Sequence, residues 1–221
     1  MRKTKTSPDE YYHIYNRGNN KQNIFLDERD WIRFLFLILN LQSPVVFYNL
    51  GRYVSNFVRH RVFNISKESL QKINNNRVVE LINFAQMPNH FHLIVLEKNI
   101  NGISQYMQRI QNAYTKYFNA KYKFHGHIFQ GPFKIIRIED NEQLLHLSAY
   151  IHRNPREIKK WFKKEDEYPW SSYQDYTAEN RWENLLQPQI ILDQFSNKNE
   201  YRKFLETSGT KLNLNEKQLL D

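Results

Sequence analysis

The stretch RVVELINFAQMPNHFHLIVLE, residues 77–97, decides the fold because it predicts two strands joined by a very short turn. Apolar and β-branched side chains dominate both halves, and Met87-Pro88-Asn89 separates them with two typical turn residues. So short a connection cannot form a parallel crossover. We therefore expect an antiparallel hairpin.

Further elements are predicted on both sides of this hairpin. Hydrophobic spacing and turn residues predict strands at 11–18 and 126–139, and helices at 27–42, 101–122, 141–153 and near 198–206. The later strand has a kink at Gly131-Pro132, and Asp140 begins the next helix with Gln143 placed as in a capping box. Strands alternating with two helices favour a ferredoxin-like α/β (α+β) sandwich.

Residues 43–76 have no clear pattern. They carry basic side chains and end in the polar run KINNNR, so a small helical insertion and a flap both remain open.

The chain contains no repeats and no low-complexity linkers. We expect one domain over 1–176 that includes this insertion, then a helical or flexible extension over 177–221 whose last dozen residues are disordered.

Composition excludes several classes of protein. The 221 residues contain no cysteine, which excludes disulfides, Cys-bound zinc, iron–sulfur clusters and thiol catalysis, and suits the cytoplasm. No apolar run reaches the ~18 residues that span a membrane, and the basic start MRKTKTSPDE lacks the apolar core of a signal peptide. We expect no membrane partner.

The charge balance indicates a nucleic-acid partner only weakly. The formal net charge is +9, and a basic surface attracts phosphate backbones. The 15 Phe, 14 Tyr and 4 Trp add rings on which unpaired bases can stack. Many ordinary soluble proteins are basic, however, and most aromatic side chains belong to a core.

Two histidines begin the second strand of the hairpin. Side chains alternate along a strand, so His90 and His92 point to one face and Phe91 to the other. Two imidazoles on one face could supply two ligands of a metal site. The competing interpretation is a pair of structural or surface histidines, because His-x-His is frequent by chance.

The helix after Asp140 supplies a second pair. Tyr150 and Asn154 are four residues apart and lie on one helix face, where they could provide a nucleophile and a third metal ligand. The alternative is a tyrosine at the core edge and an asparagine that ends the helix before Pro155. His146, one turn earlier, could assist proton transfer or be a structural histidine.

Four strings together resemble the REP-associated tyrosine transposases, a branch of the IS200-like single-tyrosine transposases with an HUH motif. In chain order they are MPNHFHLIV (87–95), GHIFQGPFK (126–134), YIHRNP (150–155) and YPWSSY (168–173). No single string is decisive, but the ordered set is specific. The resemblance runs from about Tyr11 to Tyr176.

The resemblance implies a fold and a set of site residues. It implies an HUH endonuclease core over 1–176, with a central antiparallel sheet flanked by helices. His90 and His92 match the two HUH histidines and would bind Mg²⁺ or Mn²⁺. Tyr150 begins the YI-x-x-NP string and matches the nucleophile, and Asn154 matches the third metal ligand.

The resemblance also implies the reaction and the partners. The expected activity is cleavage and joining of single-stranded DNA near palindromic hairpins, in DNA transposition or repeat mobilisation. Attack by tyrosine gives a 5′-phosphotyrosine and a free 3′-hydroxyl, and a second 3′-hydroxyl can reverse the step. We expect a monomer or homodimer associated with the nucleoid in the cytoplasm.

Contacts to DNA are less sharply indicated. Candidate phosphate ligands are Arg17, Lys134, Arg137 and Arg153, each of which could equally be a solvated surface charge. The rival hypothesis for the whole chain is a non-catalytic ferredoxin-like module that stacks bases on sheet aromatics. The distance from Tyr150 to the histidine pair distinguishes the two hypotheses.

Overall fold

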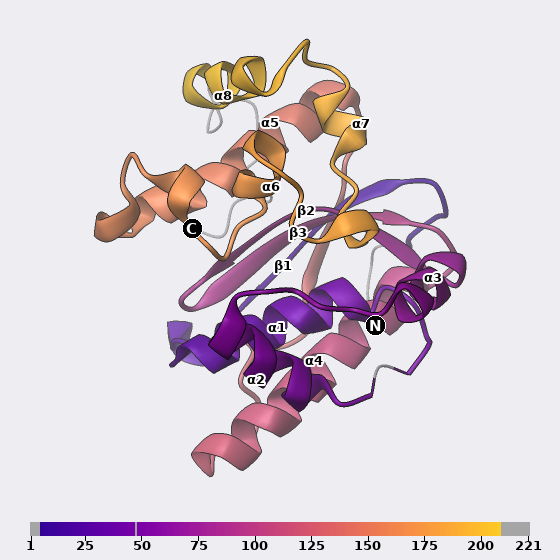
Figure 1. Ribbon diagram of the computed structural model, residues 1–221, viewed down its shortest axis with the longest axis vertical. Coiled ribbons are helices and arrows are strands. Elements are labelled where there is room, and N and C mark those ends of the chain that lie inside the picture. The colour runs from indigo at the N-terminus through magenta and orange to yellow at the C-terminus, as the bar shows by residue number, and fades with distance from the viewer. Residues whose placement is uncertain (1–4, 47, 209–221) are drawn as a thin grey trace.

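The sheet has four antiparallel strands. The computed structural model describes residues 5–46 and 48–208. The strands lie in the order β2-β3-β1-β4 (Figure 1), and their bounds are β1 Tyr11–Arg17, β2 Val79–Met87, β3 His90–Glu97 and β4 Lys134–Arg137. The antiparallel pairing of β2 with β3 confirms the hairpin predicted from residues 77–97.

Helices cover both faces of the sheet (Figure 1). The helices α1 Glu28–Asn40 and α4 Gly102–Tyr122 cover one face, while α5 Asn141–Arg153 and α8 Lys198–Thr207 lie on the other. The remaining helices are α2 Leu50–His60, α3 Lys67–Asn75, α6 Tyr173–Thr177 and α7 Gln189–Leu192. Short 3-10 turns lie at Asn19–Lys21, Asn154–Glu157, Lys159–Trp161, Glu165–Glu167 and Glu183–Leu185. This arrangement confirms the expected α/β sandwich.

The alternation of β3 divides the core into two layers. Phe91, Leu93 and Val95 are buried against the α1–α4 layer, whereas Ile94 and Leu96 are buried against the α5–α8 layer. Because side chains alternate along a strand, His90 and His92 lie on the α5 side. The chain beyond residue 176 contributes to both layers, through Trp182, Leu185 and Leu186 in the first and Ile191, Tyr201 and Leu205 in the second.

Two predicted details differ from the structure. Only Lys134–Arg137 of the stretch 126–139 forms a strand, apart from an isolated bridge between Gly18 and Phe129. Gly131 has a φ of +66°, and Pro132 lacks a backbone N–H, so neither suits a ladder. Asp140 does begin α5, but Gln143 accepts from the backbone of Glu139 at 2.6 Å instead of closing a capping box.

The segment 43–76 is helical rather than a flap. It contains α2, which packs on α1, and α3. The expected disorder of the last dozen residues concerns positions that lie outside the described ones. Among the helices of the described chain, none has both the length and the hydropathy needed to cross a bilayer.

The string YPWSSY covers the free edge of β2. The backbone N–H of Gln86 donates to Trp170 at 2.9 Å, and that of Ser172 donates to Phe84 at 2.9 Å. The Tyr168 hydroxyl also donates to the Gln86 carbonyl at 2.8 Å. Pairing an edge strand in this way removes a template for aggregation.

The first turn of α1 is tied to α4. Asp27 and Asp30 form a capping box at this end of α1. The buried Asp30 carboxylate also accepts from Lys121 at 2.7 Å, Tyr117 at 2.8 Å and Tyr122 at 2.7 Å. These bonds stabilise the carboxylate against the cost of burial.

Candidate active site

Both histidines of the pair lie at the start of β3, at one end of the sheet and next to β1. In the register of β1 with β3, His90 lies opposite Arg17 and His92 lies opposite Tyr15. The ring centroids of His90 and His92 are 5.2 Å apart. The short hairpin turn at 88–89 therefore places both imidazoles at the same edge, facing α5.

His90 and Asn154 face each other through atoms that both accept hydrogen bonds. His90 Nδ1 lies 2.7 Å from Asn89 Oδ1, so this nitrogen carries the proton. Burial lowers the pKa of His90, which favours the neutral ring and leaves a lone pair on Nε2. That Nε2 lies 3.1 Å from Asn154 Oδ1, and the Asn154 amide is oriented by donation from Nδ2 to the Tyr150 carbonyl at 3.3 Å.

A cation between these two atoms would satisfy both lone pairs. His92 offers a further lone pair because its Nε2 is buried without a hydrogen-bond partner among the described residues. Imidazole nitrogens and an amide oxygen are ligands of divalent metals. The donor set of His90, His92 and Asn154 therefore fits a metal ion, and no group of three His, Cys, Asp or Glu side chains in the described chain offers another site.

The buried His13 holds the ring of His92. His13 Nε2 lies 2.9 Å from His92 Nδ1, and neither ring is exposed to solvent. Burial lowers the pKa of His13 to about 3, and burial together with the neighbouring His13 and His90 lowers the pKa of His92 well below its usual range. Both rings are thus neutral at pH 7. When His92 Nδ1 donates to His13, Nε2 of His92 keeps its lone pair free for a metal.

Helix α5 brings Tyr150 to the same place. Leu144, Leu147 and Ile151 bury one side of α5 against the sheet. Tyr150, which is 9% exposed, packs its ring against His92 with centroids 5.7 Å apart and planes at 86°. Asn154 follows one turn later at the helix end. The structure thus brings together all four residues singled out for nucleophilic and metal chemistry.

The four candidate phosphate ligands lie in different settings. Arg17 is opposite His90 and donates from Nε to Gln130 at 2.5 Å, and the exposed Lys134 lies on β4 opposite Tyr15, towards the same end. Arg137 lies at the other end of β4, where it makes two hydrogen bonds to Glu10. Arg153 donates to the Ser208 carbonyl at 2.7 Å, beside α8.

His146, one turn before Tyr150 on α5, contacts α8 and the residue that follows it. Its Nδ1 lies 2.7 Å from the Ser208 hydroxyl, and its ring packs on Phe204 of α8. A second histidine of α5, His152, is fully buried between the hydroxyls of Tyr201 and Ser172 at 2.7 and 2.8 Å. Both histidines therefore join α5 to its neighbours.

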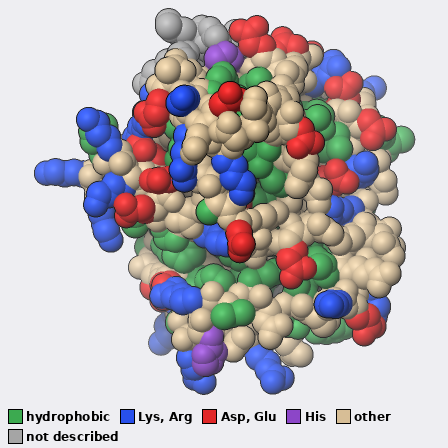
Figure 2. All heavy atoms as spheres, turned by 45° about the horizontal axis from the view of Figure 1, so that its top comes forward, with side chains coloured by type: hydrophobic (Ala, Val, Ile, Leu, Met, Phe, Trp, Pro, Cys, Tyr) green, Lys and Arg blue, Asp and Glu red, His purple; other side chains and the backbone are tan. Residues whose placement is uncertain are grey.

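Sequence reasoning missed one feature of the site, His13, whose signal was a polar ring at an alternating position within the apolar strand YYHIYNR. It also did not single out a set of exposed lysines in the segment between α5 and α6, namely Lys159, Lys160, Lys163 and Lys164. Figure 2 shows Lys and Arg side chains gathered at the left margin, on the side where Figure 1 draws the segment between α5 and α6.

Comparisons with known proteins identify a family and a related fold. The sequence model of the family described as "Transposase IS200 like" matches residues 39–154, more than half of the chain and all four residues of the site. No curated protein matches. A solved structure described as "Structure of the REP associates tyrosine transposase bound to a REP hairpin" shares the fold, with a TM-score of 0.53, 16% identity, and coverage of 81% of this chain and 85% of that one.

Proposed function

This chain belongs to the IS200-like transposase family, and from that premise we propose that it is a metal-dependent single-strand DNA endonuclease and strand transferase. The observation that supports the proposal is the convergence of one tyrosine with three neutral metal-type ligands at the edge of the sheet. Tyr150 packs on His92, and Asn154 Oδ1 faces His90 Nε2 at 3.1 Å.

In the proposed reaction Tyr150 is the nucleophile. Its phenolic oxygen forms a bond to the phosphorus of the scissile linkage, and the bond from phosphorus to the 3′-oxygen breaks. The phenol gives up a proton and the departing 3′-oxygen gains one, so the products are a 5′-phosphotyrosine and a 3′-hydroxyl. Attack by a second 3′-hydroxyl reverses the step and joins two strands without another energy source.

His90, His92 and Asn154 would hold Mg²⁺ or Mn²⁺ through two Nε2 atoms and Oδ1. When bound, the ion supplies charge neutralisation and orientation of the scissile phosphate. All three ligands are neutral, so they leave its positive charge uncompensated for the anionic substrate. Packing against His92 restricts rotation of the Tyr150 ring beside the proposed metal ligands.

The proposed substrate is single-stranded DNA that carries palindromic hairpins, in DNA transposition or repeat mobilisation. The transposase of similar fold is described as bound to a REP hairpin. Arg17 and Lys134, at the His90 end of the sheet, are the proposed phosphate contacts nearest the site. We assign this activity to the domain 1–176. We propose that the protein acts as a monomer or homodimer in the cytoplasm, associated with the nucleoid.

The test is covalent capture of DNA. End-labelled hairpin oligonucleotides from repeated palindromes of the source genome are incubated with protein and Mn²⁺, and protein-linked label is measured on denaturing gels. Wild type and Tyr11→Phe, altered at the far end of β1, should form the adduct, and Tyr150→Phe should not. Adduct formation by Tyr150→Phe would overturn the proposal.

The rival hypothesis of a non-catalytic binding module is less well supported. It accounts for the positive charge and the aromatic content. It gives no role to the Nε2 of His92, which has no partner within residues 5–46 and 48–208, or to the two facing acceptors of His90 and Asn154. Tyr150 in contact with His92 is the arrangement that a nuclease needs and a binding module does not.

A further inference from the structure

Residues 31–67 contain no Asp or Glu, although they include Arg33, Arg52, Arg59, Arg61 and Lys67. The stretch spans most of α1, all of α2 and the start of α3. A long acid-free segment with several cations gives a locally positive surface. No residue of α2 has a place in the proposed catalytic site.

Helix α2 has one apolar and one polar face. On the apolar side Val54 is buried, and Phe57 packs on Phe36 of α1 with ring centroids 5.4 Å apart. On the polar side Arg52, Asn56 and Arg59 follow a helical spacing of four and three residues, and all three are exposed. The polar face therefore remains available to a partner.

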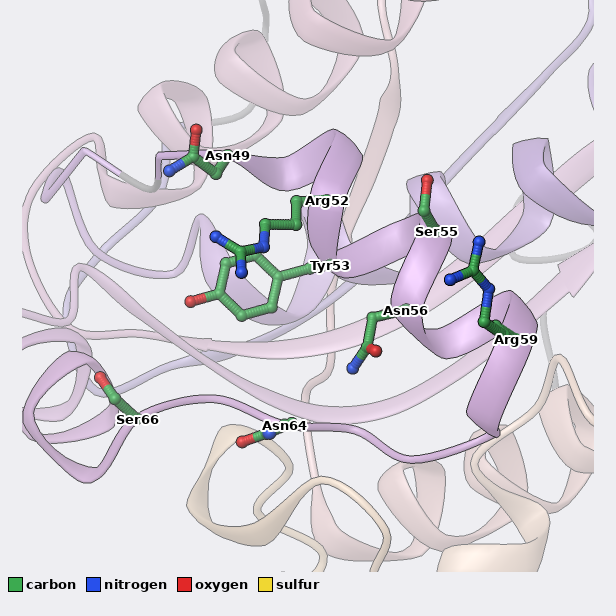
Figure 3. A pocket seen from close by; sticks show the side chains of 8 residues that line it. All are labelled: Asn49, Arg52, Tyr53, Ser55, Asn56, Arg59, Asn64 and Ser66. Carbon is green, nitrogen blue, oxygen red and sulfur yellow. The ribbon is translucent and has the colours of Figure 1, made fainter.

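This polar face forms one wall of a pocket of about 570 Å³. The other wall is the extended segment that carries Asn64 and Ser66, and Figure 3 shows Arg52, Tyr53 and Asn56 directed between the two walls. No acidic side chain lines the pocket.

The two arginines that line the pocket differ from their neighbours in having no partner among the described residues. Arg61 pairs with Glu28 and Arg29 donates to Ser55. In contrast, the side chains of Arg52 and Arg59 make no hydrogen bond or ion pair with any residue that the structure describes. Two unpaired guanidinium groups in an acid-free pocket are suited to phosphate groups.

A second, more apolar pocket of about 440 Å³ adjoins the first and shares Asn49 and Tyr53 with it. It contains Tyr48, whose side chain is 73% exposed. An exposed aromatic ring beside a positively charged groove is the combination that binds single-stranded nucleic acid, because bases without a partner stack on the ring. A duplex keeps its base faces stacked and cannot use such a ring.

The C-terminal end of α2 lies towards the end of the sheet that carries the β2–β3 turn. Arg61, directly after α2, pairs with Glu28 at the start of α1. The segment before α1 in turn contacts the β2–β3 turn, where the backbone N–H of Ile24 donates to Pro88 at 2.9 Å, two residues before His90. A strand that leaves the active site on the α5 side and passes round this end of the sheet therefore comes to α2 on the α1 side.

We propose that this α2 groove, formed by Tyr48, Asn49, Arg52, Asn56, Arg59 and Asn64, binds single-stranded DNA that flanks the cleaved hairpin. Arg52 and Arg59 contact phosphates, Tyr48 stacks on a base, and the asparagine amides contact base edges or sugars. The inference extends the proposed function by assigning a second contact for its substrate, outside the catalytic residues.

Fluorescence anisotropy with labelled oligothymidylate of about 16 nucleotides, the upper end of typical single-strand site sizes, tests this groove. We expect Arg52→Ala/Arg59→Ala to weaken binding about tenfold at low salt and to lower the log–log salt slope by about 1.4, which is two phosphates at about 0.7 each. Tyr48→Ala should weaken binding and leave the slope unchanged. Lys198→Ala/Lys203→Ala, which removes two exposed charges from α8, is the matched control and should bind as wild type does.

A second arm uses the hairpin with and without a single-stranded extension at either end. The affinity gained from one extension should disappear in Arg52→Ala/Arg59→Ala, while the affinity for the bare hairpin is unchanged. The inference would be overturned if Arg52→Ala/Arg59→Ala kept the affinity gained from the extension. It would also be overturned if Lys198→Ala/Lys203→Ala lost that gain to the same extent. Failure of the proposed function is distinguishable, because it would appear as wild-type protein that forms no adduct, whatever the extension contributes.

Discussion

His13 Nε2 lies 2.9 Å from His92 Nδ1, in a place that water does not reach. The bond joins the central sheet strands and fixes which nitrogen of His92 can bind a metal. We therefore expect His13→Phe, which keeps the aromatic volume and loses the acceptor, to lower Mn²⁺ affinity about 10- to 100-fold. Isothermal titration calorimetry measures this without activity, and His146→Phe, on α5, is the matched control.

His13→Gln should restore part of the affinity, because the amide oxygen can again accept from His92 Nδ1. Equal Mn²⁺ affinity in wild type and His13→Phe would show that His13 only fills space.

Asn154 is the neutral third ligand in the proposed site. Asn154→Ala should reduce Mn²⁺ affinity and adduct formation together, whereas Asn154→Asp should bind Mn²⁺ more tightly because a carboxylate adds charge to the same oxygen position. Calorimetry on both variants gives the order of affinities. If Asn154→Ala bound Mn²⁺ more tightly than Asn154→Asp, Asn154 would not be a metal ligand.

Metal binding should also stabilise the folded chain. A ligand that binds only the native state at 100 times its Kd adds about 2.7 kcal/mol. Thermal unfolding with Mn²⁺ or with EDTA should show this difference in wild type and none in His92→Ala. A rise of equal size in His92→Ala would place the ion elsewhere.

Asp30 predicts a pH dependence of stability. Burial alone would raise its pKa, but hydrogen bonds from Lys121, Tyr122, the Leu26 N–H and Tyr117 outweigh it and lower the pKa below its usual 3.8. Because the folded pKa is depressed, the stabilisation is complete above the unfolded pKa and is lost as pH falls through the folded one.

Asp30→Asn should therefore cost about 3 kcal/mol at pH 7, as expected for one partner removed from a buried ion pair. Denaturant unfolding of both proteins should give a constant difference down to about pH 5 and a shrinking one below about pH 4. A difference that does not change with pH would mean that the lost charge is not its cause.

Ser172 belongs to the string YPWSSY, which pairs with the edge of β2. Its hydroxyl accepts from the Phe84 N–H at 2.9 Å and lies 2.8 Å from His152 Nε2, all within the core. Ser172→Ala leaves buried polar groups without a partner and should destabilise the protein by about 1–3 kcal/mol. Urea unfolding measures the loss, and the exposed Ser196→Ala should change stability by less than about 0.5 kcal/mol.

Local patterns were enough to predict most elements. The Met87-Pro88-Asn89 turn identified the hairpin, the apolar spacing identified α1, α4 and α5, and strand alternation placed His90 and His92 on one face. Each of these depends on residues close in sequence. The stretch before Lys134 was wrongly predicted to be strand because left-handed glycine φ angles and Pro132 outweighed its apolar side chains.

The sequence by itself determined the antiparallel hairpin, the shared face of the histidines and the one-turn spacing of Tyr150 and Asn154, because these follow from the geometry of a single strand or helix. Only the tertiary structure decided that Asn154 faces His90, that His13 holds His92, and that Arg137 and Arg153 are engaged within the chain. These contacts join residues that are 55 to 127 positions apart. Such partners are chosen by how the two layers pack on the sheet, and no local pattern records that packing.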